Sequence, residues 1–324
     1  MIFPVGQESI ADFFKSQIAK GRLGHAYMLC GDEGMGKKTL CNYLLKLIMC
    51  HTNTACGVCN GCSTVESGAN PDIIYVTRGD KASIQVDAVR KAISEIYIKP
   101  LISDKKVIVI HDAHLMTKGA QNALLKAIEE PPSYVVFFLL CDSVSPILPT
   151  IISRVSKIDI PPLDVSTLKQ IVPGCMDFMY RYCQGNPGRL IKLSQDEEFA
   201  KLRDTAVAVA MTIADDDEYS IYSYESMFSD REQTARLYDL IAMFVRDVLL
   251  IKNSVDDLVV NKDKINEIIA FSSLVTARDC ARLTEIIINA RIELGKSGSV
   301  AMSWQAMIVK CREVIHDRSS RNTF

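Results

Sequence analysis

Two alternating patterns of apolar residues run through the first half of the chain. Short, nearly continuous apolar runs are typical of strands buried on both faces of a parallel sheet. They occupy 25–29, 72–76, 107–110 and 135–140. Between these runs, apolar residues return at three- and four-residue intervals, which predicts amphipathic helices that pack against a sheet. The clearest of these faces are Leu40, Leu44, Leu47 and Ile48, then Val86, Val89, Ile93 and Ile96, then Ala120, Leu124, Leu125 and Ile128. Alternating strands and helices predict an α/β domain.

The pattern changes after Pro161-Pro162, because a proline pair interrupts both helices and central strands. We place a domain boundary there. Short helices around the turn Gly185–Gly188 predict a small helical lid, and the long apolar stripes beyond it predict a helical bundle. The stripes lie at 237–251 and 283–294, and one further segment, 219–224, is a possible strand. The expected domains are 1–162, 163–200 and 201–324, α/β followed by all-α.

Composition narrows the class of protein. A chain of 324 residues suits two or three domains. No run of eighteen apolar residues occurs, and Met1–Gly6 has neither a basic segment nor an apolar signal core, so we expect a cytoplasmic protein without membrane contact. A net charge of −2 argues against a protein that coats DNA through an overall basic surface, and leaves local basic patches open. Most of the eleven cysteines lie in apolar segments and are expected to be ordinary core residues.

A glycine-rich turn, Met28–Thr39, joins the first predicted strand to a helix. Its residues Gly31, Gly34, Gly36 and Lys37 have the make-up of a loop whose backbone amides cradle phosphate groups. The complete pattern has Ser or Thr directly after the lysine, because that hydroxyl binds Mg²⁺, but this chain has Lys38 there. Thr39 comes one residue late, and one helical residue rotates a side chain by about 100°. Lys37 and Lys38 can neutralise phosphate charge without Mg²⁺, so the sequence leaves nucleotide binding open.

A second departure follows the apolar run 107–110. In P-loop ATPases an acid at the end of such a strand positions Mg²⁺. Here His111 stands where the first acid is expected, and only Asp112 remains. The adjacent pair Glu129-Glu130 ends a predicted helix before two prolines; because neighbouring helical residues point in different directions, we interpret these glutamates as solvated rather than as a catalytic pair.

Four cysteines form a C-x5-C-x2-C-x2-C pattern at Cys50, Cys56, Cys59 and Cys62. Four thiolates at this spacing surround Zn²⁺ tetrahedrally, and Gly57 and Gly61 permit the tight turns between them. Because four cysteine ligands leave no open position for water, the metal is expected to be structural. Zinc modules often bind nucleic acid, but no Lys or Arg lies between Cys50 and Cys62, which argues against phosphate contacts there.

Taken together, these segments resemble the delta-prime family of bacterial DNA polymerase III clamp-loader subunits, members of the AAA+ superfamily. The resemblance rests on GRLGHAYMLCGDEGMGKKT (21–39), the four-cysteine loop (50–62), NALLKAIEEPP (122–132) and TIISR (150–154). It implies an AAA+ P-loop-type parallel-sheet domain with a zinc loop, a small helical lid and a C-terminal helical collar. It also implies a hetero-oligomeric ring with gamma/tau and delta subunits, which uses ATP to load a sliding clamp onto primed DNA.

The resemblance also assigns roles to individual residues. Arg154 matches the arginine finger, which reaches the nucleotide bound by a neighbouring subunit, although the cysteine that usually follows it is Val155 here. Gamma and tau motor subunits share the zinc loop and this arginine, so the nucleotide site distinguishes the two types. Lys38 and His111 favour a stator that does not itself hydrolyse ATP, and a motor subunit with its own ATPase activity is the alternative. Arg189 stands one residue from the place of a nucleotide-sensing arginine, which Gly188 occupies, and we leave it out of the site.

Overall fold

The computed structural model describes residues 4–214, 230–295 and 299–316. The chain forms two compact units, one of Met1–Cys175 with Cys183–Ile191 and the other of Met176–Tyr182 with Lys192–Phe324. The possible strand at 219–224 lies outside the described residues. These two units do not test the division at 162 and 200, which stays a prediction.

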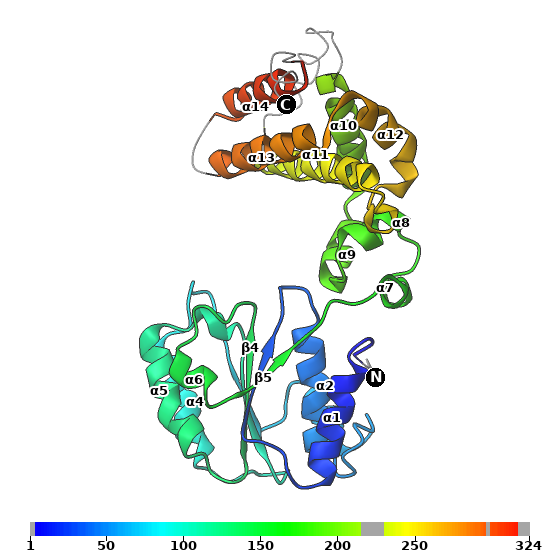
Figure 1. Cartoon of the computed structure of the whole chain (residues 1–324). Coiled ribbons are helices and arrows are strands. Elements are labelled where there is room, and N and C mark those ends of the chain that lie inside the picture. Colours follow the sequence, from blue (N-terminus) through cyan, green and yellow to red (C-terminus); the bar gives the residue numbers. More distant parts are fainter. Residues whose placement is uncertain (1–3, 215–229, 296–298, 317–324) are drawn as a thin grey trace. The chain divides into compact units, whose positions relative to one another are not determined.

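The first unit is built on a sheet of five parallel strands (Figure 1). They are β1 (Ala26–Cys30), β2 (Ile73–Val76), β3 (Lys106–Ile110), β4 (Val135–Cys141) and β5 (Ser156–Asp159). Their order in the sheet is β2-β3-β4-β1-β5. The α/β expectation is therefore confirmed, and each of the four apolar runs overlaps a strand.

Helices cover both faces of this sheet, as Figure 1 shows. One face carries α4 (Val86–Ile96), α5 (Lys118–Glu129) and the short α6 (Pro149–Ile152), and the other carries α1 (Glu8–Ala19) and α2 (Lys37–Met49). Successive strand residues point to opposite faces, so β4 sends Phe137 and Leu139 into the first layer and Phe138 and Leu140 into the second. Both layers are formed by buried apolar side chains, which hold the helices against the sheet. The remaining short helices before Pro162 are α3 (Asn60–Glu66) and the 3₁₀ turn η1 (Ala113–Leu115).

The glycine–proline turn at 185–188 packs within the first unit. It precedes α9 (Pro187–Ser194), and α7 (Val165–Ile171) lies earlier in the chain. The Leu163 amide donates to the Gly185 carbonyl oxygen at 2.9 Å. Gly185 has φ +80°, and a Cβ there would lie 2.5 Å from Pro162 Cβ, so only glycine fits this contact. The turn is thereby fixed against the segment that leaves the sheet.

Helices joined by loops make up the described residues of the second unit, as the sequence predicts. Its helices are α8 (Asp177–Tyr182), α10 (Glu197–Ala214), α11 (Arg231–Lys252), α12 (Ile265–Leu274), α13 (Ala277–Leu294) and α14 (Val300–His316), with the 3₁₀ turns η3 (Asp256–Leu258) and η4 (Lys262–Lys264). The apolar stripes at 237–251 and 283–294 lie in α11 and α13. Trp304 stacks on Tyr238 with ring centroids 6.1 Å apart, which ties α14 to α11.

A buried carboxylate organises the loop that follows α11. Asp247 is fully buried, and it accepts hydrogen bonds from the backbone amides of Val260 and Asn261, at 3.2 and 2.8 Å, and from the Asn261 side chain at 2.7 Å. Arg203 holds the other side of this loop with a 2.8 Å bond to Asn261 Oδ1. The network supplies the partners that buried polar groups require.

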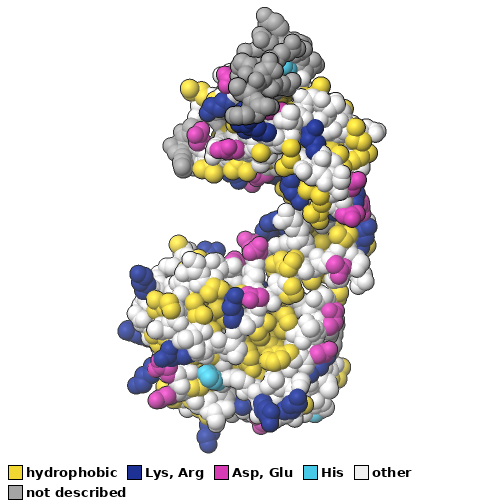
Figure 2. Space-filling model, viewed as in Figure 1, with side chains coloured by type: hydrophobic (Ala, Val, Ile, Leu, Met, Phe, Trp, Pro, Cys, Tyr) yellow, Lys and Arg dark blue, Asp and Glu magenta, His cyan; other side chains and the backbone are white. Residues whose placement is uncertain are grey.

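Three further features of the described residues are helix hydrophobicity, surface charge and the cysteines outside the four-cysteine loop. Among the described residues, no helix is long and apolar enough to cross a membrane. On the face shown in Figure 2, Lys and Arg side chains are interspersed with acidic and apolar ones and do not gather into one broad basic area. Six cysteines outside the four-cysteine loop, Cys30, Cys41, Cys141, Cys183, Cys280 and Cys311, are buried thiols, which confirms their interpretation as core residues.

Candidate functional site

The segments that follow the carboxyl ends of three neighbouring strands help to line a cavity of about 640 Å³ in the first unit. β1 leads into the glycine loop, β3 into His111-Asp112, and β4 into Asp142. In parallel α/β sheets, ligands bind at this edge, where the loops that follow the strands meet. Two acids that follow other strands, Asp112 and Asp142, line the cavity together with most of the predicted loop residues. These loop residues are Gly34, Gly36, Lys37, Lys38 and Thr39, whereas Gly31 is not among the residues that line it.

The glycine loop has the backbone that its sequence predicts. Gly34 and Gly36 have φ of +89° and +83°, which non-glycine residues rarely adopt. A Cβ at Gly34 would lie 2.6 Å from Asn186 Oδ1, because the 185–188 turn packs directly on the loop. The Asn186 side-chain amide donates to the Glu33 carbonyl oxygen at 2.8 Å, and the Gly188 amide donates to the Gly34 carbonyl oxygen at 3.0 Å. Gly188 lines the cavity, whereas Arg189 is not among the residues that line it.

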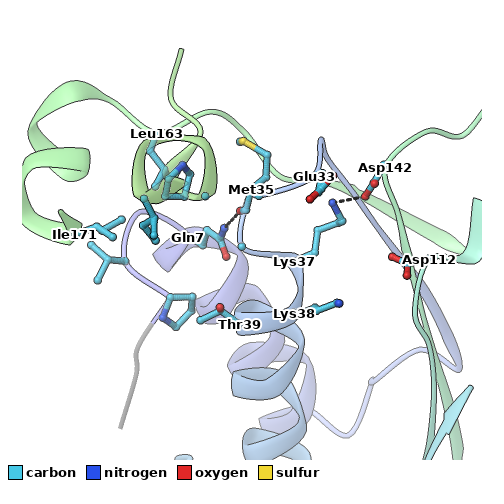
Figure 3. A pocket seen from close by; sticks show the side chains of 17 residues that line it. Gln7, Glu33, Met35, Lys37, Lys38, Thr39, Asp112, Asp142, Leu163 and Ile171 are labelled. Carbon is cyan, nitrogen blue, oxygen red and sulfur yellow. Dashed lines mark hydrogen bonds and ion pairs between the residues drawn. The ribbon is translucent and has the colours of Figure 1, made fainter. Parts of the chain in front are cut away.

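Lys37, the phosphate-binding lysine of the pattern, is engaged inside the chain. Its Nζ donates to the carbonyl oxygens of Gly31 at 2.5 Å and Asp32 at 2.8 Å. It also forms an ion pair of 2.6 Å with Asp142 Oδ1, drawn as a dashed line in Figure 3. Sequence reasoning missed Asp142, but a signal was present, because Asp142 directly follows a buried strand at the ligand-binding edge.

The two positions that bind Mg²⁺ in the complete pattern offer poor metal ligands here. Figure 3 shows Lys38 extending toward Asp112, whereas Thr39 points to the other side of α2. His111 stacks on Tyr75, with ring centroids 5.7 Å apart. Burial, followed by the nearby Lys38 charge, lowers the pKa of His111, so the imidazole is held neutral and supplies no negative charge. Asp112, with φ +51°, is the remaining acid of this segment.

The opposite wall of the cavity is mainly apolar. Val5, Leu163, Ile171 and Ile191 contribute to it. Beside them, Gln7 donates from Nε2 to the Met35 carbonyl oxygen at 3.0 Å, while its buried Oε1 has no hydrogen-bond partner among the described residues. Gln7 was not singled out from the sequence, because nothing in the linear pattern brings it to the loop 28 residues later.

The four cysteines of the predicted metal loop converge in space. Their sulfur atoms all lie within 4.8 Å of one another. Cys50 Sγ lies 3.7 Å from Cys56 Sγ and 3.8 Å from Cys59 Sγ. A tetrahedron with Zn–S bonds of about 2.3 Å has edges of about 3.8 Å, so these separations fit a four-thiolate metal site.

The loop around the cysteines is folded by its glycines and by the ends of two helices. Gly57 has φ +79°, and a Cβ on Gly61 would collide with the Met49 carbonyl oxygen at the end of α2. The Cys62 amide donates to Cys59 Sγ at 3.4 Å and lowers the pKa of the Cys59 thiol to about 7. Burial raises the pKa of Cys62 to about 12, and a bound metal cation would replace the proton of this thiol. The donor set therefore fits a cation that prefers thiolates.

Arg154 is not among the residues that line the cavity beside the glycine loop. It follows α6, from which Ser153 separates it. Its side chain is 39% exposed, and its Nε pairs with Glu129 Oε1 at 2.8 Å. Nη1 donates to the Thr150 carbonyl oxygen at 2.9 Å and to Ser153 Oγ at 3.2 Å. Glu129 is thus half exposed and ion-paired, which refines the expectation of a purely solvated pair of glutamates.

Parallel strands in the order β2-β3-β4-β1-β5, with a glycine loop after β1 and helices on both faces, define an AAA+ P-loop-type fold with a C-terminal helical region. The family model described as "DNA polymerase III, delta subunit" matches residues 6–164. The chain is 24% identical to DNA polymerase III subunit delta' of Bacillus subtilis, covering 95% of this chain and 96% of that protein.

Two further similar proteins are a tau subunit and a solved gamma subunit-related protein. The tau subunit of Escherichia coli DNA polymerase III is 32% identical over 51% of this chain, and the match spans only 26% of that longer protein. A solved gamma subunit-related protein of Thermotoga maritima aligns with 94% of this chain and 99% of its own, at 13% identity and a TM-score of 0.47. The chain belongs to the DNA polymerase III clamp-loader subunit family that includes delta', gamma and tau.

Proposed function

We propose that this chain is a delta-prime-type stator of a clamp loader, which does not hydrolyse ATP itself and supplies Arg154 to a neighbouring ATPase subunit. The observation that carries the proposal is the contrast between the chain's own cavity and its exposed arginine. Lys38 and the neutral His111 stand at the two metal-binding positions, whereas the Arg154 guanidinium is accessible and outside that cavity. The end-to-end match with a delta' subunit supports the same assignment.

The proposed role of Arg154 follows from its chemistry. A planar guanidinium stabilises the charge that develops on a transferred phosphoryl group, and such fingers contribute a factor of about 10³ to 10⁵ in rate. Arg154 would act in trans, on ATP bound by a gamma/tau subunit in a hetero-oligomeric ring that also contains delta. The ring would open the sliding clamp and place it on primed DNA, in the cytoplasm.

We further propose that the four cysteines hold a structural Zn²⁺. Zinc favours four-thiolate tetrahedral sites, and the separations of Cys50 Sγ from Cys56 Sγ and Cys59 Sγ agree with that geometry. The residues that would hold it are Cys50, Cys56, Cys59 and Cys62. Because all four positions are protein ligands, the ion would fix the loop after α2 and would take no part in hydrolysis.

The alternative function is a gamma/tau-like motor subunit. The higher identity to tau over the first half, 32%, favours it, as does the retained glycine loop with Lys37. In that case Asp112 and a water molecule would have to complete the metal site.

The test is ATP hydrolysis by a reconstituted complex, stimulated by DNA and clamp, with the normal chain, Arg154→Ala, or Arg78→Ala as an exposed-arginine control, beside the isolated chain. We expect an inert isolated chain, lower turnover with Arg154→Ala in an intact complex, and normal turnover with Arg78→Ala. Hydrolysis by the isolated chain, together with normal turnover of the Arg154→Ala complex, would establish the motor alternative.

A further inference from the structure

The Lys37 ammonium group has no donor left for a ligand. An ammonium carries three N–H bonds. Lys37 has three acceptors within the chain: the carbonyl oxygens of Gly31 and Asp32 and the carboxylate of Asp142. A phosphate group that is to bind Lys37 must therefore displace one of them. The carboxylate occupies the place that an anionic oxygen of a ligand would take.

The contact between Lys37 and Asp142 is short and shielded. The two atoms lie 2.6 Å apart, the Lys37 side chain is 9% exposed, and the Asp142 side chain is 32% exposed. Charge pairs removed from water are screened less than surface pairs, so this one resists displacement more than an exposed ion pair does. His114 packs beside the carboxylate, and its Nδ1 accepts from the Asp142 amide at 3.2 Å, which fixes the turn.

The charges that line the cavity also disfavour an anion. Three acids, Glu33, Asp112 and Asp142, face two lysines, Lys37 and Lys38. Among the described residues the lining is therefore net negative, and a polyphosphate brought there without a metal ion meets repulsion in addition to an engaged lysine.

Space is not the obstacle. A cavity of about 640 Å³ lies within the range of small-molecule sites, which is about 300–1,000 Å³. Val5, Leu163, Ile171 and Ile191 line its apolar wall. Gln7 is only 4% exposed, and its Oε1 accepts no hydrogen bond from the part of the chain that the structure describes. Charge at one end of the cavity, and not a lack of volume, thus excludes a phosphate ligand.

We propose that Asp142 acts as a built-in competitor of phosphate: its carboxylate binds Lys37 and keeps nucleoside di- and triphosphates out of this chain's own cavity. Displacement of the carboxylate opens the site. The inference deepens the proposed stator function. It rests on that function only for its role in the assembly, because Asp142 and phosphate compete for Lys37 within the isolated chain. According to this proposal, the cavity fails to bind nucleotide because of the Asp142 carboxylate as well as the missing metal ligands.

The experiment is calorimetric titration of the full chain with ADP and with ATP, without added divalent metal and without a chelator that would strip a zinc ion. The normal chain is expected to bind neither nucleotide below millimolar concentration. Asp142→Asn keeps the shape and an oxygen acceptor for Lys37 but removes the competing charge. Because hydrogen bonds to charged groups contribute about 10- to 100-fold in equilibrium terms, the variant should bind at least tenfold more tightly.

Asp112→Asn is the matched control. It removes the same charge from the same cavity, and asparagine tolerates the φ of +51° at this position, but it does not touch Lys37. We expect a gain of less than threefold. Adding Lys37→Ala to Asp142→Asn should abolish the gain. Thermal unfolding establishes that each variant is folded, and Asp142→Ser provides a second neutral replacement if Asp142→Asn is not.

Three results would overturn the proposal: equal gains from Asp112→Asn and Asp142→Asn, a gain that survives Lys37→Ala, or a folded neutral Asp142 variant that binds no better than the normal chain. The first would assign exclusion to net charge alone. None of them affects the Arg154 test, which measures turnover in the complex at a different subunit's site, so the two proposals fail separately.

Discussion

Glu129 restrains the arginine that we propose as a finger, and the strength of that restraint follows from its exposure. The pair between Glu129 and Arg154 is 2.8 Å long, but the two side chains are 43% and 39% exposed. Exposed pairs of this kind contribute about 0.2–1 kcal/mol. Glu129→Gln should therefore ease extension of Arg154 by at most about 1 kcal/mol, which corresponds to a factor of about five in turnover where extension limits the rate.

The assay is ATP turnover of the reconstituted complex, with Glu130→Gln as the matched control on the neighbouring glutamate. Glu129→Gln is expected to raise turnover up to about fivefold at low salt, with the gain fading at high salt, because screening already weakens an exposed pair. Glu130→Gln should leave turnover unchanged. A fall of tenfold or more with Glu129→Gln would refute the reasoning, because Glu129 would then hold Arg154 in its active position.

Other predictions concern stability and metal content. Metal analysis of the chain purified without chelator should find one zinc per chain, and Cys62→Ser should lose it and unfold at lower temperature; absence of zinc with four reactive thiols would exclude the site. Asp247→Ala should lower the free energy of unfolding in urea by about 3 kcal/mol, because two buried amides lose a charged acceptor, and a loss below about 1 kcal/mol would contradict this. The lowered pKa of His111 means that the folded chain favours the neutral imidazole. The stability that this neutral side chain contributes is therefore fully present above the usual pKa of 6.5 and is lost as the pH falls below 6.5. His111→Gln should accordingly lose less stability than the normal chain between pH 7.5 and 5.5, measured by urea unfolding; equal losses would refute the assignment.

Features that depend on residues close together in the chain were predictable from the sequence, whereas contacts between distant residues were not. Apolar runs predicted four strands because a buried parallel strand needs apolar side chains on both faces, and this requirement is visible in consecutive residues. The edge strand β5 was harder, since Lys157 and Asp159 are exposed and Ile158 is the one apolar residue within the strand. The glycine loop and the four-cysteine loop were readable because their geometry depends on residues within a dozen positions of one another.

The sequence by itself thus determined the α/β and all-α parts, the loop at 31–39, the metal-binding spacing at 50–62, and the missing ligands at Lys38 and His111. Tertiary structure alone decided which charges meet these residues. Asp142 reaches Lys37 because β4 lies beside β1 in the sheet, although 105 positions separate them in the chain. Gln7 and Glu129 likewise acquire their partners, Met35 and Arg154, only when separate elements pack together. The physical reason is that charge pairing and hydrogen bonding act over a few ångströms of space, which the order of residues along the chain does not specify.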